Sequence, residues 1–72
     1  MAIADRIFEA RKQVLSMTQA ELASKLGVEA VTVSRWERGT VEPRPTVIRE
    51  LARLSGMPVA WFFSTNGDEV AA

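Results

Sequence analysis

The glycines at positions 27 and 39 constrain the fold of this chain more than any other feature. Residues 18–21 form a capping box, in which a threonine caps a helix and a glutamate three residues later returns a hydrogen bond. The helix that begins there ends at Gly27, because glycine readily takes the left-handed conformation that closes a helix. A second helix, over residues 30–38, ends at Gly39 in the same way. Helices this short, joined by so few residues, must cross steeply in a helix-turn-helix arrangement.

The rest of the chain also predicts short helices. Apolar residues recur with α-helical spacing along one side of residues 4–15, namely Ile7, Phe8, Ala10, Val14 and Leu15, and Ile3 extends this stripe. A fourth helix is expected over residues 46–55, closed by Gly56, and a fifth over residues 59–63, after Pro58. We therefore expect an all-α fold of five short helices around one core. We expect the domain to cover residues 1–65 and residues 66–72 to form a flexible C-terminal tail.

The composition excludes several kinds of site. The chain has no cysteine and no histidine, so disulfides and the usual zinc, iron–sulfur and haem sites are excluded, as is histidine-based nucleophilic catalysis. So small a bundle is also not expected to hold a substrate cavity of about 300 Å³. The longest apolar run, Met57 to Phe63, is too short to cross a bilayer, and no secretory signal is recognisable. We expect a cytoplasmic protein that is not an enzyme and has no metal, cofactor, small-molecule ligand or membrane partner.

The helix over residues 30–38 has two different faces when its residues are placed about 100° apart. One face carries Val33, Trp36 and Glu37, and the other carries Val31, Ser34, Arg35 and Arg38. Because Trp36 has the largest apolar surface, its face should be buried, and Glu37 should point partly inward. Arg11 interrupts the apolar stripe of the first helix and needs a partner. We predict an Arg11–Glu37 ion pair; the alternative is that both side chains extend to solvent.

The opposite face of this helix suits the major groove of DNA. An arginine can bind guanine O6 and N7 together, and an aliphatic side chain can contact a thymine methyl group. The net charge of the chain is zero, yet nine basic and only six acidic residues lie between Arg6 and Arg53. The alternative is a helix face that is simply solvated.

Three ordered motifs resemble the Cro and lambda-repressor type of helix-turn-helix domain, also called the Xre family: Thr18-Gln19-Ala20-Glu21-Leu22-Ala23, Leu26-Gly27-Val28 and Thr32-Val33-Ser34-Arg35-Trp36-Glu37-Arg38-Gly39. The likeness continues through Pro43, Ile48, Leu51-Ala52 and Trp61-Phe62, and so covers nearly the whole chain. It implies a lambda-repressor-like bundle with the helix-turn-helix at its second and third helices. It also implies a sequence-specific double-stranded DNA-binding regulator of transcription, a repressor, encoded by a bacterium or a phage.

The resemblance also implies roles for particular side chains. Bases would be read by Ala30, Val31 and Arg35, with Ser34 on the same exposed face. Phosphates would be contacted by Gln19, Thr32, Arg38, Thr40 and Arg44. The family has an internal ion pair where Arg11 and Glu37 stand. Lys12 competes with Arg11, because the stretch from Arg11 to Gln19 is one residue longer than the common pattern. Glu29 stands where serine often caps the recognition helix, and glutamate caps poorly.

A single short recognition helix contacts few base pairs, so we expect a homodimer on a pseudo-palindromic operator. The candidate residues of the dimer seam are Val59, Trp61 and Phe63, with Phe63 preferred; ordinary core packing is the alternative reading of this cluster. The second functional class is an antitoxin-like or other protein-interaction helical module. Salt separates the two classes, because phosphate binding weakens steeply as salt rises.

Overall fold

In the computed structural model, which describes residues 2–63, every regular element is helical. Four α-helices follow one another: α1 (Ala2–Glu9), α2 (Gln19–Leu26), α3 (Ala30–Arg38) and α4 (Pro45–Ser55). A π-helical turn, η1 (Ala10–Val14), continues α1, and a 3-10 helix, η2 (Val59–Phe63), follows α4. The expected domain end at residue 65 and the expected tail 66–72 lie outside the described residues.

The all-α class is confirmed, but the prediction of a fifth α-helix over residues 59–63 is wrong. The Trp61 backbone N–H donates to the Pro58 carbonyl at 3.0 Å, an i→i+3 bond typical of a 3-10 helix. In a five-residue segment this tighter helix closes its first hydrogen bond one residue earlier than an α-helix would. α4 also begins one residue earlier than expected, at Pro45, because proline suits a first position that needs no N–H partner.

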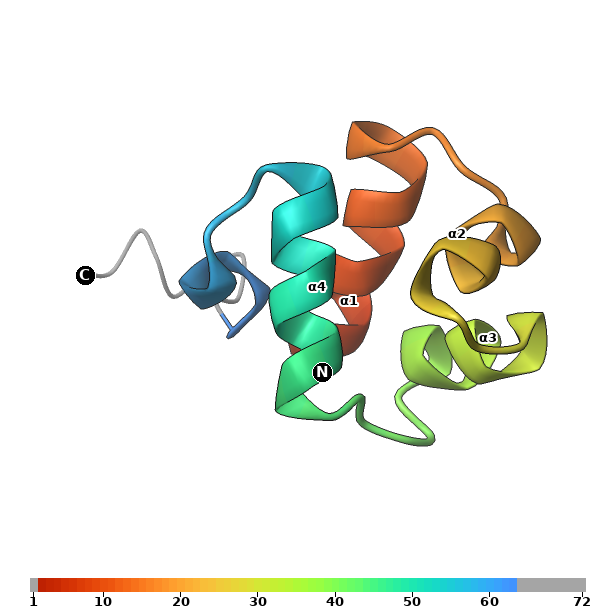
Figure 1. The fold of residues 1–72 in the computed structure, drawn as a ribbon. Coiled ribbons are helices and arrows are strands. Elements are labelled where there is room, and N and C mark those ends of the chain that lie inside the picture. The colour runs from red at the N-terminus through yellow and green to blue at the C-terminus, as the bar shows by residue number, and fades with distance from the viewer. Residues whose placement is uncertain (1, 64–72) are drawn as a thin grey trace.

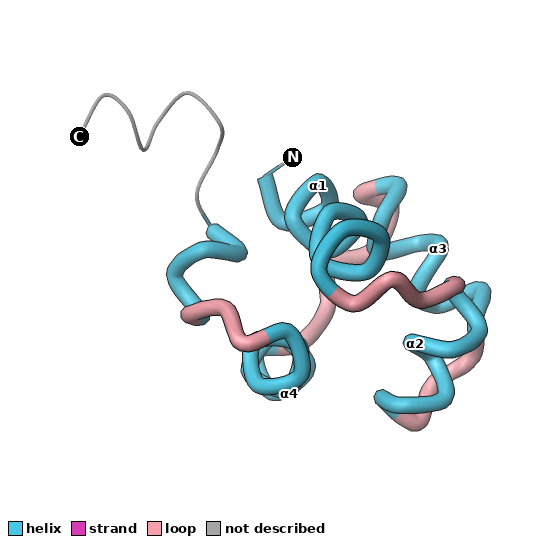
Figure 2. The backbone as a smooth tube through the Cα atoms, turned by 90° about the horizontal axis from the view of Figure 1, so that it is seen from above, coloured by secondary structure: helices cyan, strands magenta, loops and turns pink. Residues whose placement is uncertain are grey.

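The helix-turn-helix lies at one end of the molecule (Figure 1). α2 and α3 form this end, η2 forms the other, and α1 and α4 lie between them, as the view from above also shows (Figure 2). α1 contacts α3 on one side and η2 on the other. No helix of residues 2–63 combines the length and apolar character needed to cross a membrane.

The ends of α2 form as predicted. The Thr18 hydroxyl accepts from the Glu21 backbone N–H at 3.1 Å, and the Glu21 carboxylate accepts from the Thr18 N–H at 2.8 Å. Gly27 and Gly39 have φ of 73° and 75°, so both take the left-handed conformation that closes a helix. Glu29 occupies the N-cap position of α3 and makes no capping hydrogen bond through its side chain, as expected for glutamate.

The core takes side chains from every α-helix and from η2. Its largest fully buried members are Phe62, Ile7, Leu22, Leu51 and Val33. The apolar stripe predicted for the first helix is wrong at Phe8 and Val14, which are 47% and 43% exposed. The Phe8 ring instead lies 5.4 Å from the Arg11 guanidinium. Val14 leaves the stripe because a π-helical turn rotates the chain less per residue than an α-helix.

η1 ends in an unusual connection to α2. The Leu15 N–H donates to the Ala10 carbonyl at 2.8 Å, and the Met17 N–H donates to the Arg11 carbonyl at 3.0 Å. Between them, Ser16 has a φ of 54°, the single positive value for a residue other than glycine in the described chain. A serine in this region carries backbone strain that a glycine would not.

Candidate nucleic-acid interface

α3 is anchored by its inner face. Val33 is fully buried, and Trp36 is only 4% exposed. Both belong to the same cluster of buried residues as Leu22 of α2 and Ile7 of α1. The orientation of α3 about its own axis is therefore fixed by packing, and with it the direction of its outer face.

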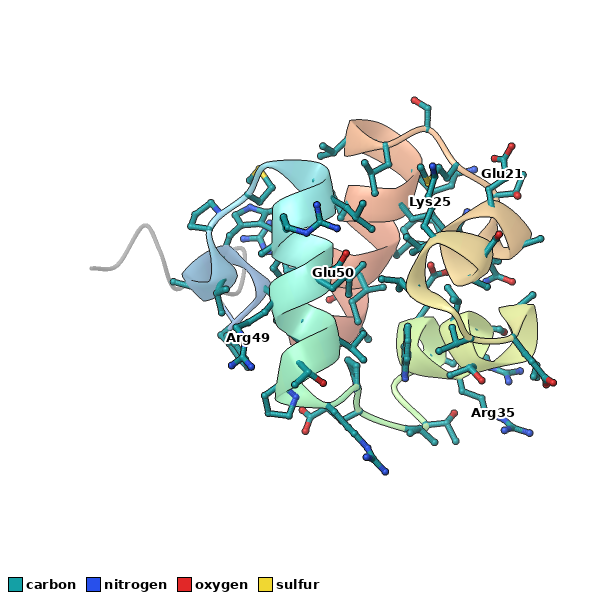
Figure 3. All side chains as sticks on the ribbon, in the orientation of Figure 1. Glu21, Lys25, Arg35, Arg49 and Glu50 are labelled. Atoms are coloured by element: carbon teal, nitrogen blue, oxygen red, sulfur yellow. The ribbon has the colours of Figure 1, made fainter. Side chains whose placement is uncertain are left out.

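The outer face of α3 presents most of the predicted base-reading side chains to solvent. Ala30 and Arg35 are exposed, and Val31 is 44% exposed, a large value for valine. Ser34 is half-buried and thus less accessible than predicted. Figure 3 shows Arg35 pointing away from the body of the protein. An aliphatic and a forked cationic side chain thus share one solvent-facing helix surface.

The arginines fall into two groups. Arg6 pairs with Glu9 at 3.1 Å, Arg11 pairs with Glu37, and Arg53 pairs with Glu50, so each of these cations has a carboxylate partner. Within residues 2–63 no ion pair involves Arg35 or Arg38 of α3, or the two arginines at and after the start of α4, Arg44 and Arg49. An unpaired exposed cation can bind a phosphate without first leaving a protein partner.

The Glu50–Arg53 pair lies on the exposed side of α4. Arg53 donates two hydrogen bonds to the Glu50 carboxylate. These bonds hold the pKa of Glu50 below its ordinary value and raise the pKa of Arg53. A pair this exposed to solvent contributes little to stability.

The predicted ion pair joins α3 to the end of the first helix. Arg11 donates to Glu37 twice, from Nε to Oε2 at 2.6 Å and from Nη2 to Oε1 at 3.0 Å. The two side chains are only 8% and 6% exposed. Arg11 also donates from Nη1 to the Met17 carbonyl at 3.0 Å, whereas the competing Lys12 is exposed. The partner of Glu37 is thus Arg11.

A further hydrogen bond reaches Glu37 from α2. Gln19 Nε2 donates to Glu37 Oε1 at 3.0 Å. Gln19 was expected to contact a phosphate, and its hydrogen bond to Glu37 was not predicted. Eighteen residues separate the two, and no local spacing rule joins them; only the crossing of α2 and α3 brings them together.

The remaining predicted phosphate contacts lie along the outer parts of α3 and the loop that follows it. Arg38, Thr40 and Arg44 are exposed, and Thr32 is half-buried. The Thr40 N–H donates to the Arg35 carbonyl at 3.0 Å, which ties the start of this loop to the end of α3. Arg44 is the N-cap residue of α4.

The expectation that no hollow of about 300 Å³ exists is wrong. A hollow of about 300 Å³ lies where the chain turns from η1 into α2, lined by Arg11, Lys12, Ser16, Met17 and Thr18. A second, of about 210 Å³, is lined by Ile3, Ala4, Trp36 and the loop 39–43. In residues 2–63 no cluster of acidic side chains is arranged to hold a metal ion.

The three candidate residues of the dimer seam differ in exposure. Val59 is 39% exposed and Phe63 is 55% exposed. Trp61 is half-buried: its ring lies 4.7 Å from the buried Arg6 guanidinium and meets Phe62 edge-on at 5.0 Å. Trp61 therefore has less surface to offer a partner than Phe63, the preferred candidate. The burial of Arg6 was missed, because its position beside the apolar stripe gave no signal of the aromatic ring that covers it.

Comparisons with known proteins agree with this geometry. The family model described as Helix-turn-helix matches residues 7–62. Among solved structures, the chain is similar to the P22 c2 repressor protein in a crystal structure with synthetic operator 9T in the presence of Tl+. The two sequences are 30% identical, the TM-score is 0.74, and the match covers 83% of this chain and 89% of that chain.

Proposed function

Because this chain belongs to the helix-turn-helix family of the Cro and lambda-repressor type, we propose that it binds double-stranded DNA sequence-specifically and regulates transcription. The observation that carries the proposal is the outer face of α3, where Val31 and Arg35 are exposed on a helix fixed by Val33 and Trp36. A helix with a locked orientation and a free reading surface is what major-groove recognition requires.

In this proposal α3 enters the major groove and reads bases directly. Arg35 binds guanine O6 and N7 through its fork, and Val31 packs on a thymine methyl group. Ala30 is short and lets the backbone approach the base edges. Ser34, being half-buried, has a smaller part, because its hydroxyl reaches less far.

The phosphate contacts fix the register of α3 on the duplex. Arg38 and Arg44 supply charge, and neither forms an ion pair within residues 2–63. The uncharged members of this group are Gln19, Thr32 and Thr40, which act as hydrogen-bond donors.

Selection of bound duplexes from a random pool, followed by salt titration on the selected site, tests the proposal. We expect one motif to be enriched and log K to fall linearly with log salt, by about 0.9 for each phosphate neutralised. A chain that serves only as a protein-interaction module would enrich no motif and show no such slope, and that result would refute the proposal.

The regulator acts as a repressor in this proposal. The support is its similarity to a protein that is itself a repressor bound to operator DNA. A domain seated in the groove excludes other proteins from that stretch of duplex. Transcription in vitro from a promoter that carries the selected site should fall as the protein is added, and a rise would contradict the repressor role.

The binding unit in this proposal is a homodimer. Val59 and Phe63 leave apolar surface on η2, at the end of the molecule opposite α2 and α3. Pairing two copies through η2 places two recognition helices on one duplex. The operator is then a pseudo-palindrome, whose half-sites reflect the two-fold symmetry of the dimer.

A further inference from the structure

We propose that Glu37, whose side chain is only 6% exposed, is a positioning residue for DNA binding because it fixes the side-chain amide of Gln19. The inference rests on the proposed function, in which Gln19 donates to a phosphate. It assigns to Glu37 a second role beside its ion pair with Arg11.

The geometry shows one carboxylate that holds two different helices. Glu37 Oε1 accepts both from Arg11 Nη2 and from Gln19 Nε2, each at 3.0 Å, while Oε2 accepts from Arg11 Nε at 2.6 Å. Only 6% of the Glu37 side chain is exposed. Hydrogen bonds to an ionised group that is shielded from water are stronger than neutral ones, so the Gln19 amide is held firmly.

The Glu37 carboxylate also determines the orientation of the Gln19 side-chain amide. The oxygen and nitrogen of a glutamine amide have nearly the same shape, but an ionised carboxylate only accepts. The Nε2 end of Gln19 must therefore face Glu37, with one N–H engaged there and one left over. Phosphate oxygens likewise only accept, so this remaining N–H is the group that serves a phosphate.

The bond crosses the helix-turn-helix. Gln19 is the first residue of α2, and Glu37 lies near the end of α3, on the face opposite Arg35. A hydrogen bond between them ties the start of α2 to the helix that reads bases. The phosphate contact of Gln19 therefore depends on Glu37, whereas Arg35, on the opposite face of α3, forms no ion pair with Glu37 within residues 2–63.

The hydrogen bond is tested first without DNA. In NMR spectra the side-chain amide of Gln19 should show one proton shifted downfield and slow to exchange. The double variant Arg11→Met with Glu37→Leu replaces the ion pair by apolar groups and should abolish this signature. Gln13, the other glutamine of the chain, is exposed and serves as the internal control.

The positioning role is tested by a double-mutant cycle on the selected operator. Gln19→Met should weaken binding about tenfold, and Arg11→Met with Glu37→Leu by a similar factor. The variant that combines all three substitutions should have an operator affinity no lower than that of the more weakly binding of these two variants. Ile48→Ala destabilises the core elsewhere, and below its melting temperature it should bind as the wild type does, which separates positioning from loss of stability.

Each outcome discriminates. Provided that the wild type binds DNA, two results would overturn the positioning role. One is that the losses of affinity from Gln19→Met and from the replaced ion pair add up in the combined variant; the other is that replacing the ion pair leaves the affinity unchanged. Failure of the wild type to bind any duplex would refute the proposed function and the positioning role together. If the double variant does not fold, Glu37→Asp withdraws the carboxylate by one methylene, and it should show the same loss of amide signature and affinity. A wild-type signature and affinity in Glu37→Asp would overturn the role.

Discussion

The arginines of this chain differ in whether they already form an ion pair with a carboxylate. Arg11 gives up its donors to Glu37 and a backbone carbonyl, whereas Arg35 and Arg38 form no ion pair in residues 2–63. The buried pair of Arg11 contributes to the fold, and the unpaired arginines are available to a partner. This division separates variants that should affect stability from variants that should affect DNA affinity.

Arg35 and Arg38 should respond differently to truncation although they share a helix. Arg35→Ala should relax the preference for one guanine per half-site and cost about 1–3 kcal/mol on the selected operator, because a forked base contact is lost. Arg38→Ala should weaken all duplexes alike and flatten the salt slope by about one. Binding titrations on matched and mismatched duplexes measure both, and an intact guanine preference in Arg35→Ala would show that another side chain reads that base.

Removal of Glu37 should affect the fold itself. Glu37→Ala leaves the Arg11 guanidinium buried without its carboxylate, and breaking a buried pair typically costs about 3–5 kcal/mol. Replacing both partners, as in Arg11→Met with Glu37→Leu, should recover much of that free energy of unfolding. Thermal melts of the wild type and both variants decide the matter; equal melting of Glu37→Ala and the wild type would mean that the pair contributes nothing.

Ser16 offers the opposite case, in which a single change should stabilise the chain. Its φ of 54° suits glycine, so Ser16→Gly should raise the free energy of unfolding by about 0.5–1 kcal/mol. The matched control is Gly27→Ala, at a φ of 73° with nothing within 4 Å of the added carbon, where strain alone should lower stability. Chemical denaturation of both variants checks the signs, and a Ser16→Gly variant less stable than the wild type would contradict the strain argument.

At the scale of the elements, local sequence signals predicted α2 and α3 to the residue. Their caps and closing glycines act through neighbours three or four positions away, and such short-range hydrogen bonds need no knowledge of the rest of the chain. The π-helical character of η1 and the 3-10 character of η2 were not predictable in this way. Both depend on contacts between residues far apart in the sequence. The Gln19–Glu37 hydrogen bond, which joins residues 18 positions apart, was not predictable for the same reason.

η1 accommodates an extra residue without disturbing what lies on either side of it. The resemblance to the family implies that the stretch from Arg11 to Gln19 is one residue longer than the common pattern, and a π-helical turn adds one residue to a helix. Arg11 thereby keeps its register with Glu37 while α2 still begins at Gln19.

Deletion of Gln13, which is exposed within η1, should turn the π-helical turn into regular α-helix and preserve the fold. Deletion of Ser24 from α2 should unfold the chain, because the later residues of α2 would rotate by about 100° around the helix and Leu26 would leave the core. Circular dichroism and thermal melts compare the two. Loss of helical structure in the Gln13 deletion would show that the π-helical turn is itself required.

The molecule has its reading surface on α3 at one end and the exposed Val59 and Phe63 of η2 at the other (Figure 1). Two recognition helices can enter successive major grooves only if they lie about 34 Å apart, one helical turn of DNA. Pairing through η2 is the proposed way to reach that separation. Phe63, at 55% exposure, is the largest apolar group available for it.

Phe63→Asp should therefore leave a folded monomer that no longer binds the full operator cooperatively, because a buried unpaired charge would oppose the dimer seam. Half-sites about ten base pairs apart, centre to centre, are the expected DNA substrate. Sedimentation with and without operator measures the stoichiometry. Lys25→Asp changes a charge on exposed α2 and should leave self-association intact; an undisturbed 2:1 complex in Phe63→Asp would place the seam elsewhere.

The two tryptophans allow the two ends of the molecule to be followed separately by fluorescence. The chain has no tyrosine, and its two tryptophans lie at opposite ends, Trp36 buried in α3 and Trp61 half-buried against Arg6 in η2. Each end thus carries its own fluorophore, and the surroundings of the two differ in polarity. With Trp61→Phe the emission of the protein reports on the helix-turn-helix alone, and with Trp36→Phe it reports on η2 alone. Coincident unfolding curves from the two single-tryptophan chains would show that both ends of the molecule melt as one cooperative unit.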